Sequence, residues 1–474
     1  MKHGFTIIGV AAALGCLPFF SSCHEDNGDK YFPITAVAND TLMGHVGGGG
    51  KYREGDIVKL TATPAPGYEF YQWDDGCPDN PRMVDVKNVG NYTAIFRVKN
   101  EGVTAQHLSG VIKEDLILKD KGLKIDYVID SALIIDNSAL LSIESGVTIE
   151  FAGEKACIIV EDGAAMRMSG KDASPVILQG PNDNSNKGSW GYVEYRSGRM
   201  ENEMLYVRIN NGGCDKEGAV LRLTGNASVS IQYCTLAGGL GMGISSFEAE
   251  GNPFKAFVSN RISNFDSYAM HISLKQVNHL GVGNQYPNNK NCILVSDSLI
   301  EAEAITFSNQ GISYLMEGDL TVGEDGILVM EAGVNMSFKQ DAKLLVTEAG
   351  TLQVNGIYSS LVSIRGMLDG VPGYWKGIDF QSNRNAFGGN YLHYCLVNGG
   401  GSEENGACLS LADEVKLDLK GAQFFNSGHY GIKIRLNPET AKMDGLTSES
   451  IKFANNKVGN VYDATTNQTL TELP

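Results

Sequence analysis

The chain has 474 residues, with 38 Lys and Arg against 55 Asp and Glu, and its formal net charge is −17 at pH 7. A chain this acidic repels phosphate backbones, so we expect no nucleic acid among its partners. Its length allows two or three domains, and the 57 glycines scattered between short β-branched runs predict many strands and tight turns.

The N-terminal stretch reads as a secretory signal. Residues 1–22 contain an apolar run, FTIIGVAAALGCLPFF, that is too short and too poorly flanked for a membrane span but fits the core of a signal peptide. Two serines then precede Cys23, and residues 23–30 form an acidic tether.

This stretch resembles a bacterial lipoprotein signal, in which the cysteine receives lipid and becomes the mature N-terminus. The acidic tail after Cys23 resembles the export signal of Bacteroidetes surface lipoproteins. The resemblance implies a protein that a lipid on Cys23 anchors in the outer membrane, facing the cell exterior, so that a membrane is one partner. Cys16 is an alternative lipidation site, and an ordinary signal peptide with an incidental cysteine is another alternative.

Residues 31–98 form a small separate unit. Apolar and polar residues alternate in VKLTATPAPGYEFYQWDDG, and NYTAIFRV supplies a closing strand of period two. The segment resembles the divergent internalin-type B repeat, a compact β-rich surface module, at Gly55, Trp73 and Phe96 among other positions. The resemblance implies that Trp73 belongs to the core and that this unit carries no chemistry of its own.

The remainder, residues 99–474, contains an internal repeat. ALIIDNSALLSIESGVTIEF at 132–151 returns as DLTVGEDGILVMEAGVNMSF at 319–338, with a constant shift between the matched apolar positions. Repeats at long period are typical of stacked architectures. We therefore interpret the second half, about 301–474, as a diverged copy of the first, about 106–300.

Within each copy, short strands recur about every ten residues with Gly, Asn or Asp at the bends, as in an all-β chain. Strands this short need neighbours above and below them, and parallel strands need the buried faces that the inward aliphatic residues supply. The domain resembles the right-handed parallel β-helix repeat proteins of Bacteroidetes. We predict an all-β chain in which a right-handed parallel β-helix follows the small β-rich module; such a fold hosts many activities and names none of them.

We predict no catalytic residues. Glu194 and Asp379 occupy equivalent positions of the two copies, but stacked coils would separate them by on the order of 35–40 Å. Cooperating carboxylates need a separation of roughly 5–10 Å. The string GHYGIKIR at 428–435 resembles elements of β-helical polygalacturonases but lacks their aspartates, so we interpret His429 as an exposed turn residue.

We also predict no metal and no cofactor. The acidic residues are spread one per turn and do not cluster as calcium ligands do. Seven cysteines follow Cys23 without a CxxC pair, which indicates neither a disulfide framework nor a zinc site. Most of them lie in strand-like runs, where Cys behaves as a small apolar residue.

The main ligand-binding candidates lie in an irregular insertion, residues 275–291. Loops that interrupt a regular solenoid usually lie on its binding face. This loop carries His279, Asn284, Gln285 and Tyr286, whose amide and aromatic groups suit hydroxyl-rich ligands. The alternative is a disordered polar loop without a ligand.

Trp190 and Tyr192 are further candidates, because residues of equal parity on one strand face the same way and aromatic rings stack on sugars. Trp190 recurs in the second copy as Trp375, however, and this recurrence favours an architectural anchor over a ligand site.

Our first functional hypothesis is a non-catalytic cell-surface binding or adhesion protein for glycans or another extracellular ligand. The first alternative is a polysaccharide-active lyase or hydrolase on the β-helix scaffold. The second is a structural spacer or assembly protein with a surface-protein partner. The partners we expect are thus a membrane through the lipid anchor and a polysaccharide or a surface protein.

Overall fold

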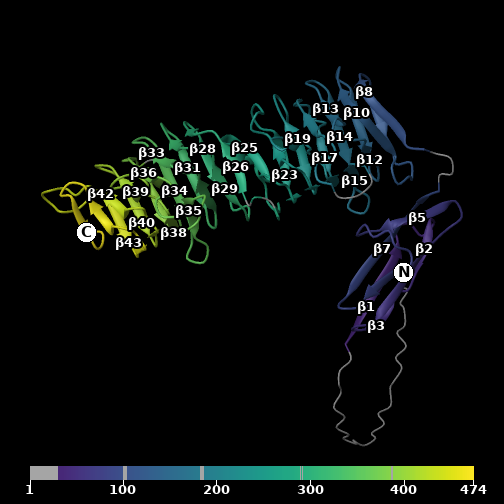
Figure 1. Ribbon diagram of the computed structural model, residues 1–474, viewed down its shortest axis with the longest axis horizontal. Helices are drawn as coiled ribbons and strands as arrows, with labels where there is room; N and C mark the ends of the chain where they lie inside the picture. Colours follow the sequence, from purple (N-terminus) through teal and green to yellow (C-terminus); the bar gives the residue numbers. More distant parts are fainter. Residues whose placement is uncertain (1–29, 100–103, 182–185, 289, 291, 386–387) are drawn as a thin grey trace, which may run out of the picture. The chain divides into compact units, whose positions relative to one another are not determined.

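The structure is a computed structural model that describes residues 30–99, 104–181, 186–288, 290, 292–385 and 388–474. The chain divides into two compact units, residues 1–99 and 100–474 (Figure 1). The signal-like segment, with Cys16 and Cys23, lies outside the described residues. No helix within the described ranges is long and apolar enough to cross a membrane.

The first unit contains two small sheets. They are ordered β3-β1-β7-β5 and β2-β4-β6, and only β1 and β7 pair in parallel. Trp73 is fully buried in the core of this unit with Phe96 and Leu60, which confirms that the tryptophan is structural. The strands are β1 (Tyr31–Ala38), β2 (Gly44–Gly47), β3 (Gly50–Arg53), β4 (Ile57–Pro64), β5 (Tyr68–Trp73), β6 (Arg82–Asp85) and β7 (Gly90–Val98).

The second unit is a stack of coils whose strands pair in parallel with those of the next coil (Figure 1). The one antiparallel strand pair among its described residues is β45–β46 at the C-terminal end. An all-β chain with a parallel β-helix is therefore confirmed.

One ladder of strands, which we call the through ladder, runs through both halves. It contains β13 (Cys157–Val160), β16 (Val193–Tyr195), β19 (Ala219–Leu223), β22 (Met242–Ser245), β25 (Met270–Ser273), β26 (Cys292–Ser296), β29 (Ser313–Met316), β32 (Asn335–Phe338), β35 (Val362–Gly366), β38 (Cys395–Asn398), β41 (Gln423–Phe425) and β44 (Lys452–Ala454).

Two further ladders belong to the first half. One contains β12 (Thr148–Phe151), β15 (Val176–Gln179), β18 (Val207–Asn210), β21 (Thr235–Ala237) and β24 (Arg261–Ser263). The other contains β9 (Leu116–Leu118), β11 (Leu140–Glu144), β14 (Ala165–Ser169), β17 (Glu203–Leu205), β20 (Val229–Gln232) and β23 (Phe254–Val258). At the N-terminal end, β8 (Gln106–Ile112) pairs with β10 (Tyr127–Ile135), which in turn pairs with β12 and β13.

The second half has two ladders of its own. One, the C-terminal ladder, contains β27 (Leu299–Ile300), β30 (Leu320–Val322), β33 (Lys343–Val346), β36 (Gly377–Phe380), β39 (Ala407–Leu411), β42 (Tyr430–Ile434), β45 (Gly459–Asp463) and β46 (Gln468–Leu470). The other contains β28 (Ala304–Phe307), β31 (Ile327–Glu331), β34 (Thr351–Asn355), β37 (Tyr391–His393), β40 (Leu417–Lys420) and β43 (Leu446–Glu449).

The ladders of the first copy do not continue into the equivalent ladders of the second copy. In the sequence repeat β12 corresponds to β32, yet β32 belongs to the ladder that contains β13. The β12 ladder ends at a single bridge between Arg261 and Gln285, and the C-terminal ladder begins at β27. A short 3₁₀ helix, η1 (Leu274–His279), follows β25 at this junction. The coil at the junction therefore shifts the second copy by one face.

Two aromatic stacks mark equivalent points of the core. Trp190 stacks on Phe151 with 3.9 Å between ring centroids, and Trp375 stacks on Phe338 with 4.8 Å. The indole Nε1–H of Trp190 donates to the carbonyl of Asn210, and Trp375 makes the equivalent bond. Trp190 has no exposed surface, so it is the architectural anchor that its recurrence favours and not a residue that a ligand can reach.

Candidate functional site

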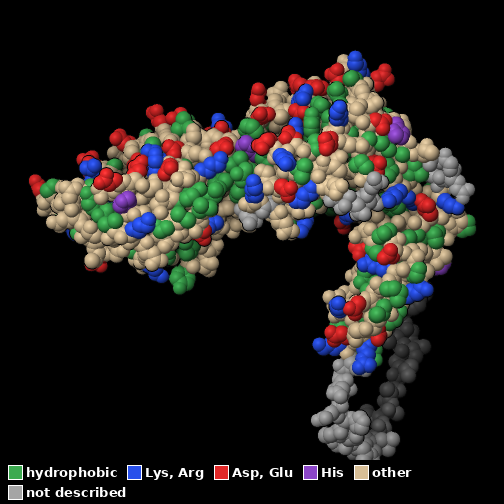
Figure 2. Space-filling model, viewed as in Figure 1, with side chains coloured by type: hydrophobic (Ala, Val, Ile, Leu, Met, Phe, Trp, Pro, Cys, Tyr) green, Lys and Arg blue, Asp and Glu red, His purple; other side chains and the backbone are tan. Residues whose placement is uncertain are grey.

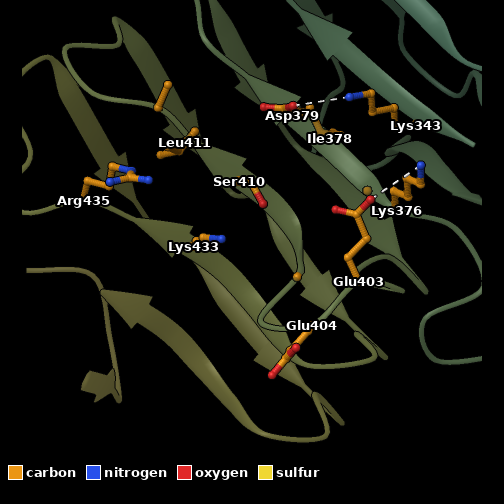
Figure 3. A pocket seen from close by; sticks show the side chains of 13 residues that line it. Lys343, Lys376, Ile378, Asp379, Glu403, Glu404, Ser410, Leu411, Lys433 and Arg435 are labelled. Atoms are coloured by element: carbon orange, nitrogen blue, oxygen red, sulfur yellow. Dashed lines mark ion pairs between the residues drawn. The ribbon is translucent and has the colours of Figure 1, made fainter. Parts of the chain in front are cut away.

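A polar groove lies on the outer face of the C-terminal ladder (Figure 3). It has a volume of about 260 Å³, and we call it the Lys433 groove. The side chains that give it its chemistry are those of Lys343, Lys376, Asp379, Glu403, Glu404, Ser410, Lys433 and Arg435.

The parallel register places the central residues of the groove. Asp379 on β36 is opposite Ser410 on β39, which is opposite Lys433 on β42. Side chains at one register position of stacked parallel strands form a column with a spacing of about 4.8 Å. Inward-facing Ile378, Leu409 and Ile432 alternate with this column and are buried, so the three polar side chains face outward.

The cations of the groove fall into two classes. Lys343 lies 3.6 Å from a carboxylate oxygen of Asp379, and Lys376 lies 3.5 Å from one of Glu403 (Figure 3). Lys433 and Arg435 have no ion-pair partner among the described residues. Two neighbouring unpaired cations form a site that can bind the carboxylate or sulfate groups of a ligand.

A second groove follows the through ladder next to the junction. It has a volume of about 440 Å³, and we call it the His271 groove. Arg222, Ser245, His271 and Leu294 are register neighbours on successive strands of this ladder and line it together. The ring of Phe247 stacks on the imidazole of His271 with 4.0 Å between the centroids, so one face of the histidine is covered.

A chain of hydrogen bonds leads from His271 to a lysine. The Nε2 atom of His271 lies 2.6 Å from Ser296 Oγ, and Ser296 Oγ donates to Glu317 over 2.9 Å. Lys339 Nζ donates to the other carboxylate oxygen over 3.1 Å. Because Ser296 gives its hydrogen to Glu317, its oxygen accepts the Nε2–H of His271, and the lone pair of the neutral imidazole is on Nδ1.

The ionisation of this chain follows from its surroundings. Burial lowers the pKa of His271, which is 8% exposed. The hydrogen bond from Lys339 lowers the pKa of Glu317. Nδ1 of His271 has no hydrogen-bond partner among the described residues. The neutral histidine can therefore accept a hydrogen bond or a proton from a molecule in the groove.

The loop 275–291 does not bring its predicted residues together. His279 is exposed at the end of η1, and Gln285 is exposed and accepts a hydrogen bond from the Arg261 guanidinium. Tyr286 points into the core and is 8% exposed, so the prediction that it contacts a ligand is wrong. Its inward position follows from the coil that the loop forms between the two halves.

The amide of Asn284 is also occupied by the fold. Its Oδ1 accepts a hydrogen bond from the backbone N–H of Asn260, and its Nδ2 donates to the carbonyls of Gly281 and Phe257. Asn284 thus joins neighbouring coils, and both its amide oxygen and its amide nitrogen have partners within the protein.

Tyr192 does not face the same way as Trp190. The strand β16 begins at Val193, and Trp190 pairs with Gly212 in an isolated bridge before it, so the alternation of side chains along β16 does not extend back to Trp190. Trp190 lies in the core, whereas Tyr192 is half-buried with the Arg222 guanidinium 3.9 Å from its ring centroid. The guanidinium already covers one face of the tyrosine ring.

The sequence contained one signal for the Lys433 groove. Lys433 and Arg435 alternate in the string GHYGIKIR, but our interpretation concentrated on its histidine. That residue, His429, is half-buried rather than exposed, and its Nδ1 lies 3.2 Å from the carbonyl oxygen of Gly401. No sequence signal linked His271 to Glu317, because the two residues belong to different coils.

Charges of both signs are interspersed over the visible face of the β-helix (Figure 2).

Within the part of the chain that the structure describes, no group of three or more His, Cys, Asp or Glu residues is placed to hold a metal ion. The seven cysteines that follow Cys23 are all free.

Comparison with protein families identifies two segments. Residues 34–109 match the divergent InlB B-repeat domain, and residues 110–199 match the pectate-lyase like beta helix domain. No match was found among curated proteins or among solved structures. These domains fit a surface module, and their order is the one that the sequence predicted. The chain therefore carries a divergent InlB B-repeat domain followed by a pectate-lyase-like β-helix domain.

Proposed function

We propose that the protein is a cell-surface lipoprotein that binds an acidic polysaccharide in the Lys433 groove without cleaving it. The observation that carries this proposal is the pair of cations, Lys433 and Arg435, without an ion-pair partner among the described residues. The two domain types suit a module at the cell surface. The anchor on Cys23 and the location in the outer membrane are part of the same proposal.

The chemistry of the groove favours an acidic glycan. A guanidinium binds a carboxylate through two parallel hydrogen bonds, and an ammonium adds a second charge beside it. The hydroxyl of Ser410 lies next to Lys433 and can donate to or accept from a sugar hydroxyl. A chain with a net charge of −17 repels polyanions elsewhere, so this local positive site would determine where the polymer binds.

The state of the carboxylates in the groove favours binding over cleavage. Asp379 is paired with Lys343, and Glu403 is paired with Lys376. A glycoside hydrolase needs one protonated and one ionised carboxyl group flanking the bond that it cleaves. Both carboxylates are therefore engaged by lysines, which leaves Glu404 as the one carboxyl group of the groove without an ion pair among the described residues.

The test is electrophoresis of the full chain in gels that contain uronate-rich or neutral polysaccharides. We expect slowed migration in a uronate-rich gel, and recovery of migration when Lys433→Ala and Arg435→Ala are combined. The matched control combines Lys416→Ala with Lys457→Ala, which removes the same charge at exposed positions outside the groove. Added salt should weaken the retardation of the wild type.

Equal retardation of the groove variant and the control would contradict the proposal, as would unchanged migration in every acidic polymer.

The His271 chain favours a second candidate function, a polysaccharide-active enzyme. An imidazole whose Nε2–H is held by Ser296 and whose Nδ1 is unpaired has the arrangement of a general base. If the protein cleaves a polymer, the viscosity of that polymer should fall with time, and His271→Ala should abolish this change. Constant viscosity with every polymer that the protein binds would reject this candidate.

A further inference from the structure

One corner of the β-helix differs between the two copies. The strands β17 and β20 belong to one ladder of the first half, and β37 and β40 belong to the equivalent ladder of the second half. Each of these four strands is followed directly by one residue with positive φ. These residues are Tyr206 (φ 48°) and Tyr233 (φ 54°) in the first half, and Tyr394 (φ 45°) and Gly421 (φ 61°) in the second. Their backbones are bonded alike, since the N–H of Tyr206 donates to the carbonyl of Gln232 and that of Tyr394 to the carbonyl of Lys420.

The side chains at this corner are not alike. In the first half the rings of Tyr206 and Tyr233 stack, with 4.9 Å between centroids and 12° between planes. In the second half Gly421 has no ring to offer, and Tyr394 lies against its bare Cα, so that an added Cβ would be 2.7 Å from Tyr394 Cδ1. The ring of Tyr233, which stacks on Tyr206 in the first copy, therefore has no counterpart in the second.

A cleft of about 540 Å³ lies at this corner of the second half. We call it the Tyr394 slot, and its walls include Tyr358, Leu361, Tyr394, Gln423 and Lys452. Its volume is within the range of clefts that bind small molecules, roughly 300–1,000 Å³.

A second difference between the copies adds an aromatic wall. The turn that holds Tyr358 is closed by a bridge between Ile357 and Ser360, and the first copy has the same bridge between Lys171 and Ser174. Asp172 occupies the place of Tyr358 there. Tyr358 is 86% exposed at the slot, so the second copy has an accessible ring where the first has a carboxylate.

Polar groups at the slot are available to a ligand. Lys420 is paired with Glu449 at 3.1 Å, whereas Lys452 has no ion-pair partner and Gln423 no side-chain hydrogen bond among the described residues. Aromatic walls with a free amide and a free ammonium suit a ring with an apolar face and polar substituents. A tyrosine side chain of a partner protein would fill the slot but would leave the amide of Gln423 and the ammonium of Lys452 without partners.

We propose that the Tyr394 slot binds one six-membered sugar ring of a glycan, with the C–H face of the ring on Tyr394 and its polar substituents toward Gln423 and Lys452. The slot involves residues distinct from those of the Lys433 groove, so this inference does not depend on the function proposed for that groove.

The test fills the slot with a side chain of the protein itself. Gly421→Tyr introduces a ring at a backbone position that matches Tyr233 in φ. The ring of Tyr394 must move to make room for it, and the stacked pair of Tyr206 and Tyr233 shows the arrangement that two tyrosines adopt at the corner of the first copy. Titration calorimetry of the full chain with acidic and neutral oligosaccharides should detect binding to the wild type. Gly421→Tyr and Tyr358→Ala should each weaken it roughly tenfold or more. Tyr233→Phe is the matched control and should bind as the wild type does.

Two outcomes would overturn the proposal. The first is unchanged affinity in both Gly421→Tyr and Tyr358→Ala. The second is binding of tyrosine amide by the wild type with no oligosaccharide bound. If Gly421→Tyr does not fold, Tyr358→Ala still decides, because its side chain is exposed. The combined Lys433→Ala and Arg435→Ala variant should keep slot binding, so failure of the groove proposal and failure of this one give different results.

Discussion

The indole ring of Trp375 stacks on the phenyl ring of Phe338, with 4.8 Å between the centroids and 5° between the planes. Both side chains are fully buried. Trp375→Ala should lower the free energy of unfolding by about 3–5 kcal/mol, because a large aromatic side chain is removed from a close-packed core. Urea unfolding followed by circular dichroism measures this loss.

Trp375→Phe separates the stack from the hydrogen bond of the indole. The phenyl ring keeps part of the stacking but cannot donate to the carbonyl of Asn398. We expect a smaller loss than for Trp375→Ala. Equal losses in the two variants would show that stacking does not stabilise this coil.

The pH dependence of stability should contain a contribution from His271. Burial holds its pKa below the ordinary value of 6.5, so the unfolded chain binds more protons than the folded chain as the pH falls through that value. The free energy of unfolding should therefore decrease as the pH is lowered from about 7.5 to about 5, and His271→Gln should reduce this decrease. Glu317 stays ionised in this window, because the bond from Lys339 keeps its pKa below 4.5.

Urea midpoints of the wild type and of His271→Gln at the two pH values give this difference directly. An equal fall in both proteins would mean that the histidine does not contribute.

Thiol reactivity should follow burial. Burial raises the pKa of Cys234 to about 12 and that of Cys395 to about 12, so both are protonated at neutral pH and shielded from reagents. Cys77 is half-buried. In the native chain iodoacetamide should modify Cys77 before Cys234 or Cys395, as peptide mass spectrometry can measure. Early modification of Cys395 would show that the second half opens more readily than its packing implies.

Membrane attachment should depend on one cysteine. Cys23→Ala should move the protein from the membrane fraction to the soluble fraction, as an immunoblot would show, because acyl chains on this residue are the proposed anchor. The control is Cys16→Ala, which should stay in the membrane fraction. Retention of Cys23→Ala together with release of Cys16→Ala would move the anchor to Cys16.

Periodicity and repetition in the sequence determined the architecture of this protein. Leu133 and Leu320 return at the same place in the two copies and are both buried, because each faces inward in a coil that needs apolar contacts above and below. The module around Trp73 could be predicted for a related reason, since alternating residues and turn signals are local properties of the chain.

The candidate sites were decided by tertiary structure. The grooves and the slot are formed between coils, so their chemistry depends on which residues of successive coils come opposite one another. His271, Ser296 and Glu317 meet because β25, β26 and β29 pair across the junction, where the second copy is shifted by one face. Coils of unequal length set this register, and the local periodicity of the sequence does not determine which distant strands pair.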